Sequence, residues 1–330
     1  MRILLAGQID QSAIAYLKCS HQVTHADYMG RDYLRALLAD CDILVFRSGV
    51  SLDRELLGCA PHLQLVIRAG CGVDNIDIDY LQQRGIRLER IPEPAAQAVA
   101  EMSFALMLAL ARQLRTADVL LRGGRWAKYQ LEGHLLAGKT LGIVGAGNIG
   151  SRVGQLAVAF GMFPIGCVED CTPGTREELL KKGIVAASFE TVLSRAQFVT
   201  VHVPLTHKTR HLLDAVALSR MRPGSFLVNL SRGGVVDEEA LLTELLHGRR
   251  IKGAALDVHE VEGEGKISPL AALPNVILTP HIGAMTVDTQ KEIGRRVVNI
   301  VDTFCNSHSE RATELTSPNL GPQALPVTNV

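Results

Sequence analysis

Three glycines are the residues of this sequence best suited to binding a phosphorylated ligand: Gly145, Gly147 and Gly150, in KTLGIVGAGNIGSRVGQ. They follow a short apolar run and precede a helical pattern, which is the context in which a G-x-G-x-x-G turn holds a pyrophosphate. The first glycine permits a tight turn, the second lets the backbone approach the phosphates, and the third lets helix and strand pack closely. Free N–H groups at the start of the helix, around Asn148 and Ile149, would face the phosphates. We therefore predict a dinucleotide site, with a glycine-rich turn that binds no ligand as the alternative.

An acidic residue some 20 positions beyond such a turn usually binds the adenosine ribose. The next apolar run, PIGCV, ends at Val168, and Glu169 lies 19 residues after Gly150. We predict that Glu169 accepts a hydrogen bond from the ribose. No Arg stands directly beside Glu169 to hold a 2′-phosphate, although Arg176 is close in the sequence, so the pattern favours NAD over NADP.

Three later segments carry side chains suited to hydride transfer. Arg232 lies in LVNLSRGGVVDEEAL, Asp257 and Glu262 lie in GAALDVHEVEG, and His281 lies in ILTPHIGA. Each side chain comes just after an apolar run that predicts a strand. Because the carboxyl ends of the strands line one crevice in a doubly wound sheet, these side chains can converge on one ligand.

The elements that must position these residues alternate along the chain. In the first part, the runs ILLA, DILVF and LQLVI alternate with helical patterns and predict a small α/β domain with a parallel sheet. In the second part, six apolar runs predict a doubly wound sheet, with strands at 141–144, 164–168, 198–201, 225–229, 253–256 and 276–278. Between the two parts, nearly continuous apolar spacing from Glu101 to Leu121 predicts one long buried helix.

Length and charge narrow the class of protein. A chain of 330 residues suits two domains. The 34 basic residues balance 34 acidic ones, so the sequence lacks the positive field of a nucleic-acid or membrane binder, and we expect a small-molecule substrate. The apolar run near the N-terminus is too short for a signal peptide, which predicts a cytoplasmic location. Residues 308–330 are rich in Ser, Thr, Asn and Pro without periodicity and predict a flexible or surface-draped tail.

The sequence predicts no metal site. Its seven cysteines are scattered and match no zinc-site spacing. His202, His207 and His211 lie close together, but the surrounding VHVPLTHKTRHL contains no acidic or Cys ligand.

Eight segments, in this order, resemble the D-isomer-specific 2-hydroxyacid dehydrogenases: RAGCGVDNID, AVAEMSFALMLALAR, GKTLGIVGAGNIG, FGM, VHVPLTHKTRHL, MRPGSFLVNLSRGGVVDEEAL, GAALDV and NVILTPHIGA. The chain is most similar to the short phosphoglycerate-dehydrogenase type without a regulatory domain. The resemblance implies two Rossmann-like α/β domains, with an NAD-binding domain at 95–284 inserted into a flavodoxin-like substrate domain at 1–94 and 285–307. It also implies hydride transfer between NAD(H) and C2 of a small D-2-hydroxy acid or 2-oxo acid, of the 3-phosphoglycerate, hydroxypyruvate or glyoxylate type.

The same resemblance implies catalytic roles. Arg232 would hold the substrate carboxylate and carbonyl, for which a guanidinium fork is well shaped. His281 would protonate the carbonyl oxygen as the hydride arrives. Glu262 would pair with His281 and favour its charged form. Glu260 is the alternative partner, because Gly263 stands where the family usually has Pro. For Arg232 a surface ion pair, and for His281 a place in the core, are the structural alternatives.

The resemblance further implies ligand contacts. Asp257 would contact the nicotinamide carboxamide, and the cofactor would also be lined by Val203, Leu230, Ser231, His281, Gly283 and Ala284. In the first domain, the backbone of Cys71 and Gly72 would meet the substrate carboxylate. Arg47 and Ser48 would reach the far end of the substrate, although Arg47 could instead be solvated.

Two departures from the family pattern weaken the prediction of a phosphorylated substrate. Arg90 stands where the family has Asn, and residues 93–95 replace positions that are often Gly. The basic run that follows Trp126 in phosphoglycerate dehydrogenases is thinned here, at 126–130.

Two other functions stay open at this point. Corepressors of the C-terminal-binding type share this fold and these catalytic groups, and fold alone cannot separate them from enzymes. The sequence favours the enzyme because it has no notable partner-binding extension. A formate or phosphite dehydrogenase of the same fold would keep the enzyme and change the hydride donor. Finally, the family and the apolar helical stretch from Ala98 to Leu114 predict a homodimer.

Overall fold

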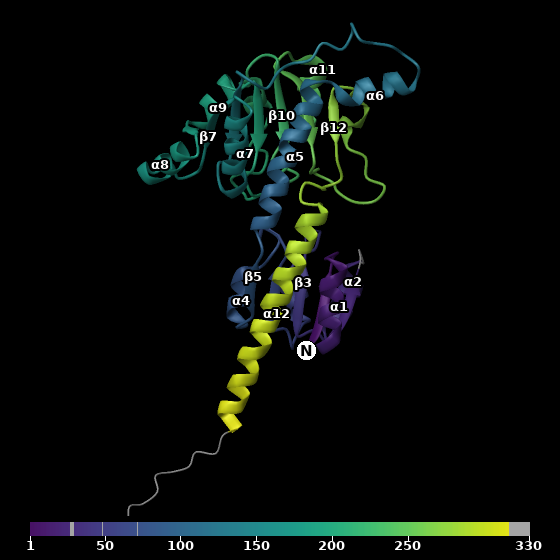
Figure 1. Cartoon of the computed structure of the whole chain (residues 1–330), viewed down its shortest axis with the longest axis vertical. Coiled ribbons are helices and arrows are strands. Elements are labelled where there is room, and N and C mark those ends of the chain that lie inside the picture. Colours follow the sequence, from purple (N-terminus) through teal and green to yellow (C-terminus); the bar gives the residue numbers. More distant parts are fainter. Residues whose placement is uncertain (27–29, 48, 71, 317–330) are drawn as a thin grey trace, which may run out of the picture.

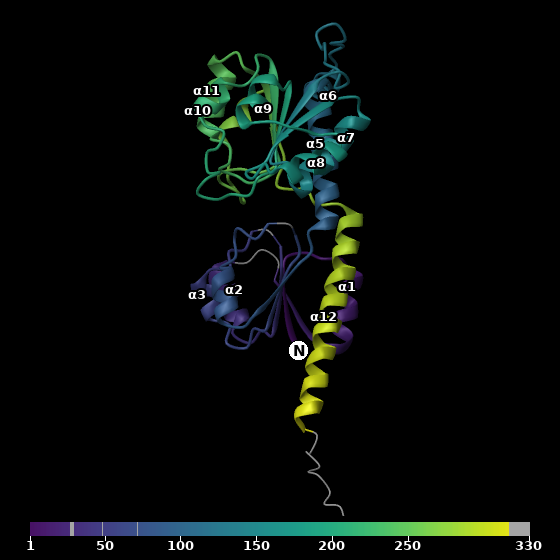
Figure 2. The ribbon, with the colours of Figure 1, turned by 90° about the vertical axis from the view of Figure 1, so that its left-hand side faces the viewer.

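Two α/β domains are stacked along the long axis of the molecule, as Figures 1 and 2 show. The computed structural model describes residues 1–26, 30–47, 49–70 and 72–316, with side chains up to Ser307. Each domain contains one parallel sheet with helices on both faces (Figure 2). Two long helices, α5 (Glu93–Ala111) and α12 (Val287–Thr316), connect the domains.

The first domain has a five-stranded sheet in the order β2-β1-β3-β4-β5, which is the flavodoxin-like order. Its strands are β1 (Arg2–Ala6), β2 (Gln22–Ala26), β3 (Ile43–Phe46), β4 (Leu65–Arg68) and β5 (Arg87–Arg90), and its short helices are α1 (Gln11–Ser20), α2 (Arg31–Leu38), α3 (Arg54–Gly58) and α4 (Ile78–Gln83). The sequence predicted β1, β3 and β4 but not the two edge strands. The edge strands are largely solvent-facing and carry polar residues, so they lack a continuous apolar run.

The second domain has a seven-stranded sheet in the order β12-β11-β10-β9-β6-β7-β8, which extends the Rossmann order. Its strands are β6 (Thr140–Val144), β7 (Phe163–Cys167), β8 (Val185–Ala186), β9 (Phe198–Val201), β10 (Ser225–Asn229), β11 (Ile251–Leu256) and β12 (Val276–Leu278). Its helices are α7 (Asn148–Ala159), α8 (Pro173–Lys181), α9 (Phe189–Arg195), α10 (Ala215–Ser219), α11 (Glu238–His247) and the 3-10 helix η1 (Pro269–Ala272). All six predicted strands are confirmed, and only the two-residue β8 is an addition.

The long helix predicted between the domains is divided into two. The α5 helix ends at Ala111, and α6 (Leu114–Arg122) follows after a break. At the break, Gln113 adopts a left-handed conformation with φ of 53°, and its side-chain amide donates to the carbonyl of Glu132. Apolar spacing does not reveal such a break, because the pattern resumes on the other side. By length and composition α5 could span a membrane, but 61% of its apolar stretch is buried inside the protein.

The last helix returns to the first domain. Ile293, Val297, Val301 and Phe304 of α12 are buried in the core on the α1 side of the first sheet, so the second domain is an insertion within the first. The helix continues to Thr316, so the first part of the tail predicted from residue 308 is helical instead. The prediction relied on the Ser, Thr, Asn and Pro content of the whole stretch from 308 to 330. Its first part contains no proline before Pro318 and includes good helix formers such as Glu, Arg, Ala and Leu, which explains the helix.

Candidate active site between the domains

A cleft of about 400 Å³ lies where the carboxyl ends of the two sheets face each other. Arg47 and Arg68 line it from the first domain, and Arg232, Asp257 and His281 line it from the second. The predicted catalytic residues have therefore come together from distant parts of the chain. Of the predicted cofactor residues, Ile149, Leu230, Gly283 and Ala284 also line this cleft.

The glycine turn between β6 and α7 has room for a dinucleotide. Gly145 has a φ of 92°, and a Cβ at Gly150 would overlap the carbonyl oxygen of Gly145, so both positions require glycine. A Cβ at Gly147 would meet nothing within 4 Å, which leaves open space in front of the turn. No side chain caps the N-terminus of α7, so its first N–H groups are available to a phosphate. These residues fit the pyrophosphate of NAD.

The predicted ribose ligand, Glu169, lies two residues after the end of β7 and is largely exposed. Its carboxylate accepts from the Lys208 ammonium at 2.6 Å. This hydrogen bond and the positive charge of Lys208 lower the pKa of Glu169. The carboxylate is thus ionised and close to the expected adenosine end of the site, while the contact with the ribose stays a prediction.

Two further predicted cofactor residues, Ser231 and Val203, lie just after the ends of β10 and β9. The backbone N–H and the hydroxyl of Ser231 both donate to Asn229 Oδ1, at 3.0 and 2.7 Å. Val203 lies against the glycine turn, where its Cγ1 would be 2.7 Å from a Cβ at Gly145. Val203 therefore shapes the wall of the glycine turn, whereas Ser231 is held at the end of β10.

Asp257 fixes the loop that carries His281. This buried carboxylate accepts from the Thr279 hydroxyl at 2.6 Å and from the N–H groups of Ile282 and Gly283 at 2.9 and 2.7 Å. His281 itself is held with a φ of 55°, a left-handed conformation that costs about 1–3 kcal/mol in a non-glycine residue. The hydrogen bonds to Asp257 on both sides of His281 explain how this conformation is maintained.

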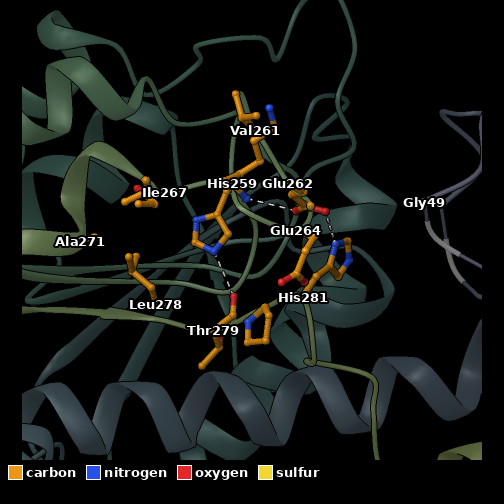
Figure 3. Close-up of a pocket in the computed structure, with 14 residues that line it drawn as sticks. Gly49, His259, Val261, Glu262, Glu264, Ile267, Ala271, Leu278, Thr279 and His281 are labelled. Carbon is orange, nitrogen blue, oxygen red and sulfur yellow. Dashed lines mark hydrogen bonds and ion pairs between the residues drawn. The ribbon is translucent and has the colours of Figure 1, made fainter. Parts of the chain in front are cut away.

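His281 and Glu262 form a pair on the wall of a second cavity of about 680 Å³ (Figure 3). His281 Nδ1 lies 3.0 Å from Glu262 Oε2. Burial alone raises the pKa of Glu262, but the hydrogen bond and positive charge of His281 outweigh it, and the net effect is a lowered pKa. Glu260, the alternative partner, contacts the N–H of Glu238 and the ring of His211 instead. With Nδ1 engaged, Nε2 of His281 is the nitrogen that can donate to a ligand.

Arg232 is held across the cleft by a residue that sequence reasoning missed. Its Nε and Nη2 donate to the two carboxylate oxygens of Asp74 at 2.9 and 3.0 Å. Burial alone raises the pKa of Asp74, but the hydrogen bond and charge of Arg232 outweigh it and lower that pKa. Gly72 is essential to this arrangement, since a Cβ there would overlap the guanidinium. Asp74 lies in RAGCGVDNID, so its place two residues after Gly72 was the available signal.

The first domain adds two arginines to the cleft. Arg68, also missed, is only 4% exposed; its Nε donates to the carbonyl of Gly72, and its guanidinium lies over the ring of Phe46. Arg47 contacts the side-chain oxygen of Gln290, and burial lowers the pKa of Arg47. The two other predicted substrate contacts, Ser48 and Cys71, lie outside the described residues.

Comparison with known proteins agrees with this geometry. The family model of the "D-isomer specific 2-hydroxyacid dehydrogenase, NAD binding domain" matches residues 104–283, more than half of the chain. The chain belongs to the D-isomer-specific 2-hydroxyacid dehydrogenases.

Relatives of this dehydrogenase share most of its length. The hydroxypyruvate reductase of Thermotoga maritima is 35% identical over 300 residues, which are 90% of this chain and 96% of that protein. The D-3-phosphoglycerate dehydrogenase of Mycobacterium bovis is 38% identical over 299 residues, 91% of this chain but only 56% of that protein. The chain thus spans about half the length of the phosphoglycerate dehydrogenases it matches.

A solved structure supports the same grouping. The D-lactate dehydrogenase of Aquifex aeolicus, complexed with NAD and lactic acid, has a TM-score of 0.81 and 28% identity, and the match covers 98% of this chain and all of that one. The predicted family, fold class, NAD cofactor and reaction class are therefore confirmed: this dehydrogenase is an NAD-dependent oxidoreductase of 2-hydroxy acids.

Proposed function

We propose that this dehydrogenase uses NADH to reduce a small 2-oxo acid with a polar or anionic far end, of the hydroxypyruvate type. The observation that carries the proposal is the meeting of Arg232, His281, the half-buried Arg47 and the buried Arg68 in one cleft. A carboxylate, a carbonyl oxygen and a second polar group would each find a cationic partner there.

Each catalytic side chain has a distinct task in this proposal. Arg232 binds the carboxylate of the substrate and fixes the position of its C2. His281 donates a proton from Nε2 to the carbonyl oxygen, and the carboxylate of Glu262 stabilises the charged imidazole before transfer. The nicotinamide, when bound, would supply the hydride as NADH and would accept it as NAD⁺ in the reverse direction. Closing the domains would exclude water from the cleft.

In this proposal, Arg47 and Arg68 of the first domain select the substituent at the far end of the substrate. A guanidinium donates hydrogen bonds in a planar fork, so Arg47 and Arg68 should favour a polar or anionic substituent over an apolar one. Hydroxypyruvate and its phosphorylated form suit this surrounding better than phenylpyruvate. The T. maritima relative is named a hydroxypyruvate reductase, which agrees with this choice.

The test is oxidation of NADH, followed by absorbance, with hydroxypyruvate, phosphohydroxypyruvate, glyoxylate, pyruvate and phenylpyruvate. We expect hydroxypyruvate or its phosphorylated form to have the highest kcat/KM, and His281→Ala to abolish turnover. Arg47→Leu should lower kcat/KM at least tenfold for these two substrates while changing that for pyruvate little. Preference for pyruvate or phenylpyruvate would contradict the assignment of the far end.

We also propose that two copies of the chain form a dimer through α6 and the segment that follows it. Six large apolar side chains are exposed there: Leu114, Val119, Leu121, Trp126, Tyr129 and Leu135. Exposed apolar side chains that are grouped along one segment are typical of a protein interface. A second copy is the occupant we favour, because the net charge of zero offers no complement to a charged partner.

Light scattering after size-exclusion chromatography tests the dimer. We expect the native protein to have twice the mass of the monomer, and the double variant Leu121→Glu/Trp126→Glu to have the mass of a monomer. Leu246→Glu, on the exposed face of α11, is the matched control and should stay dimeric. A monomeric native protein would refute the proposal.

A further inference from the structure

The Glu262–His281 pair rests on His259, a residue with no role assigned so far. His259 lies just past the end of β11, two residues after Asp257, and its side chain is largely buried. Figure 3 shows its ring between the segment that carries Glu262 and the end of β12. Gly233, next to Arg232, packs so closely on His259 that a Cβ there would overlap the carbonyl of His259.

His259 makes two hydrogen bonds to the catalytic segments. Its backbone N–H donates to Glu262 Oε1 at 3.1 Å, while Glu262 Oε2 faces His281. Its ring Nε2 lies 3.0 Å from the carbonyl oxygen of Thr279, two residues before His281. Since a carbonyl oxygen only accepts, Nε2 of His259 must carry a hydrogen. One residue thus contacts the segments of all three catalytic side chains.

The second ring nitrogen of His259 faces a buried carboxylate. Its Nδ1 is buried without a hydrogen-bond partner among the described residues and lies 4.0 Å from Glu238 Oε1. Glu238, the first residue of α11, is 4% exposed and accepts from the N–H of Glu260 and from the Ser268 hydroxyl. With Nε2 protonated, a neutral ring would turn a lone pair toward this carboxylate, whereas a proton on Nδ1 would turn the contact into an ion pair.

Other charged groups also surround His259. On its own segment, Glu262 pairs with His281, and Glu260 lies 3.1 Å from His211 Nε2. Glu264 and Lys266 line the same cavity as His259. Glu238 is the carboxylate that faces His259 Nδ1, at 4.0 Å.

We propose that His259 is a positioning residue: its backbone N–H holds Glu262, and its ring Nε2 holds the carbonyl of Thr279 at the start of the His281 loop. The two contacts keep Glu262 and His281 in register with each other. This inference rests on the proposed role of His281 as the proton donor.

Imidazole NMR of the ligand-free protein tests the positioning without requiring turnover. His259→Phe removes both ring nitrogens, His259→Gln keeps an amide donor near the position of Nε2, and His62→Gln, at an exposed histidine, is the matched control. We expect the ring resonances of His281 to move in His259→Phe and to stay close to their native positions in His259→Gln and His62→Gln. Unchanged His281 resonances in His259→Phe would overturn the positioning role.

The steady-state kinetics of His259 variants test the effect of this positioning on turnover. His259→Phe keeps the volume of the ring but loses both polar atoms, so we expect kcat to fall at least tenfold with KM and NADH affinity within about twofold, because a misplaced proton donor affects the chemical step. His259→Gln should recover most of kcat. Full kcat in His259→Phe would overturn the positioning role. An equal loss of kcat in His259→Gln, together with a lowered Tm of that variant, would also overturn it. A native enzyme that turns over no 2-oxo acid would instead refute the proposed function, and the NMR result would stand apart from it.

Discussion

At the scale of single residues, the site depends on carboxylates that orient cationic groups. Asp74 engages Nε and Nη2 of Arg232, Asp257 anchors the loop around His281, and Glu262 faces the ring of His281. Each charged donor is therefore fixed before a ligand arrives, which is the arrangement that makes hydride transfer fast.

Asp74→Asn tests whether Asp74 directs Arg232. The amide keeps the shape but removes the charge and one acceptor, so the guanidinium should lose its fixed direction. We expect KM for the 2-oxo acid to rise about tenfold, equivalent to roughly 1.4 kcal/mol, with the affinity for NADH unchanged by fluorescence titration. If KM fell instead, Asp74 would be a competitor of the substrate for Arg232.

The pH dependence of catalysis should reflect Glu262. Because its folded-state pKa is lowered, the carboxylate and its pairing with His281 are fully present above the pKa of a free Glu, about 4.3, and are lost as the pH falls through the lower folded-state value. We therefore expect the native enzyme to keep its 2-oxo acid reductase activity down to pH 5, measured over the stable range of the protein. Glu262→Gln removes the carboxylate that favours the charged form of His281. As the pH rises, the activity of this variant should therefore decline at a lower pH than the activity of the native enzyme. Identical alkaline limbs would show that the pair does not govern proton donation.

At the scale of elements, the turn from β6 to α7 contains one glycine that the fold requires and another that ligand binding requires. Gly150 packs against the carbonyl of Gly145, whereas the Cβ position of Gly147 is open. Ala at these two positions should therefore have opposite effects.

We expect Gly150→Ala to lower the free energy of unfolding by about 1–3 kcal/mol, as overpacking does, in urea denaturation. Gly147→Ala should leave that free energy nearly unchanged but weaken NADH binding at least tenfold, because its methyl group would occupy the space of the pyrophosphate. Tight NADH binding by Gly147→Ala would place the pyrophosphate elsewhere.

At the scale of the whole molecule, the last helix completes the first domain after the chain has formed the second. Val297 and Val301 of α12 are fully buried against the first sheet, and Arg296 pairs with Glu93 of α5 at 3.0 Å. Both connecting helices are therefore tied to each other where the domains meet, which makes them the natural hinge for closure.

A point substitution and a shortened chain together test the contribution of α12 to stability. Val297→Ala should destabilise the protein by about 2 kcal/mol, because it removes buried methyl groups. A chain that ends at Ser307 should keep the native Tm in calorimetry, since Phe304 is the last buried residue among the α12 side chains that the structure describes. A large fall in the Tm of the shortened chain would mean that residues beyond 307 also stabilise the fold.

Through its resemblance to a family, the sequence pointed to Arg232, Glu262 and His281 as the catalytic candidates. The sequence by itself also determined the glycine turn and the six main strands of the second sheet, because each of these signals is a local pattern of apolar runs and turn residues. The same logic failed for β2 and β5, whose exposed edges lack an apolar run, and for the break at Gln113, where a single backbone angle interrupts a continuous pattern.

Only the tertiary structure decided which side chains meet. Arg232 and Asp74 are 158 residues apart, Arg68 enters the cleft from the other domain, and His259 faces Glu238 across two elements. It also decided between Glu262 and Glu260 as partner of His281. Local patterns set where strands end, but the paths of the loops between them set which ends come within hydrogen-bond distance, and those paths depend on packing throughout both domains.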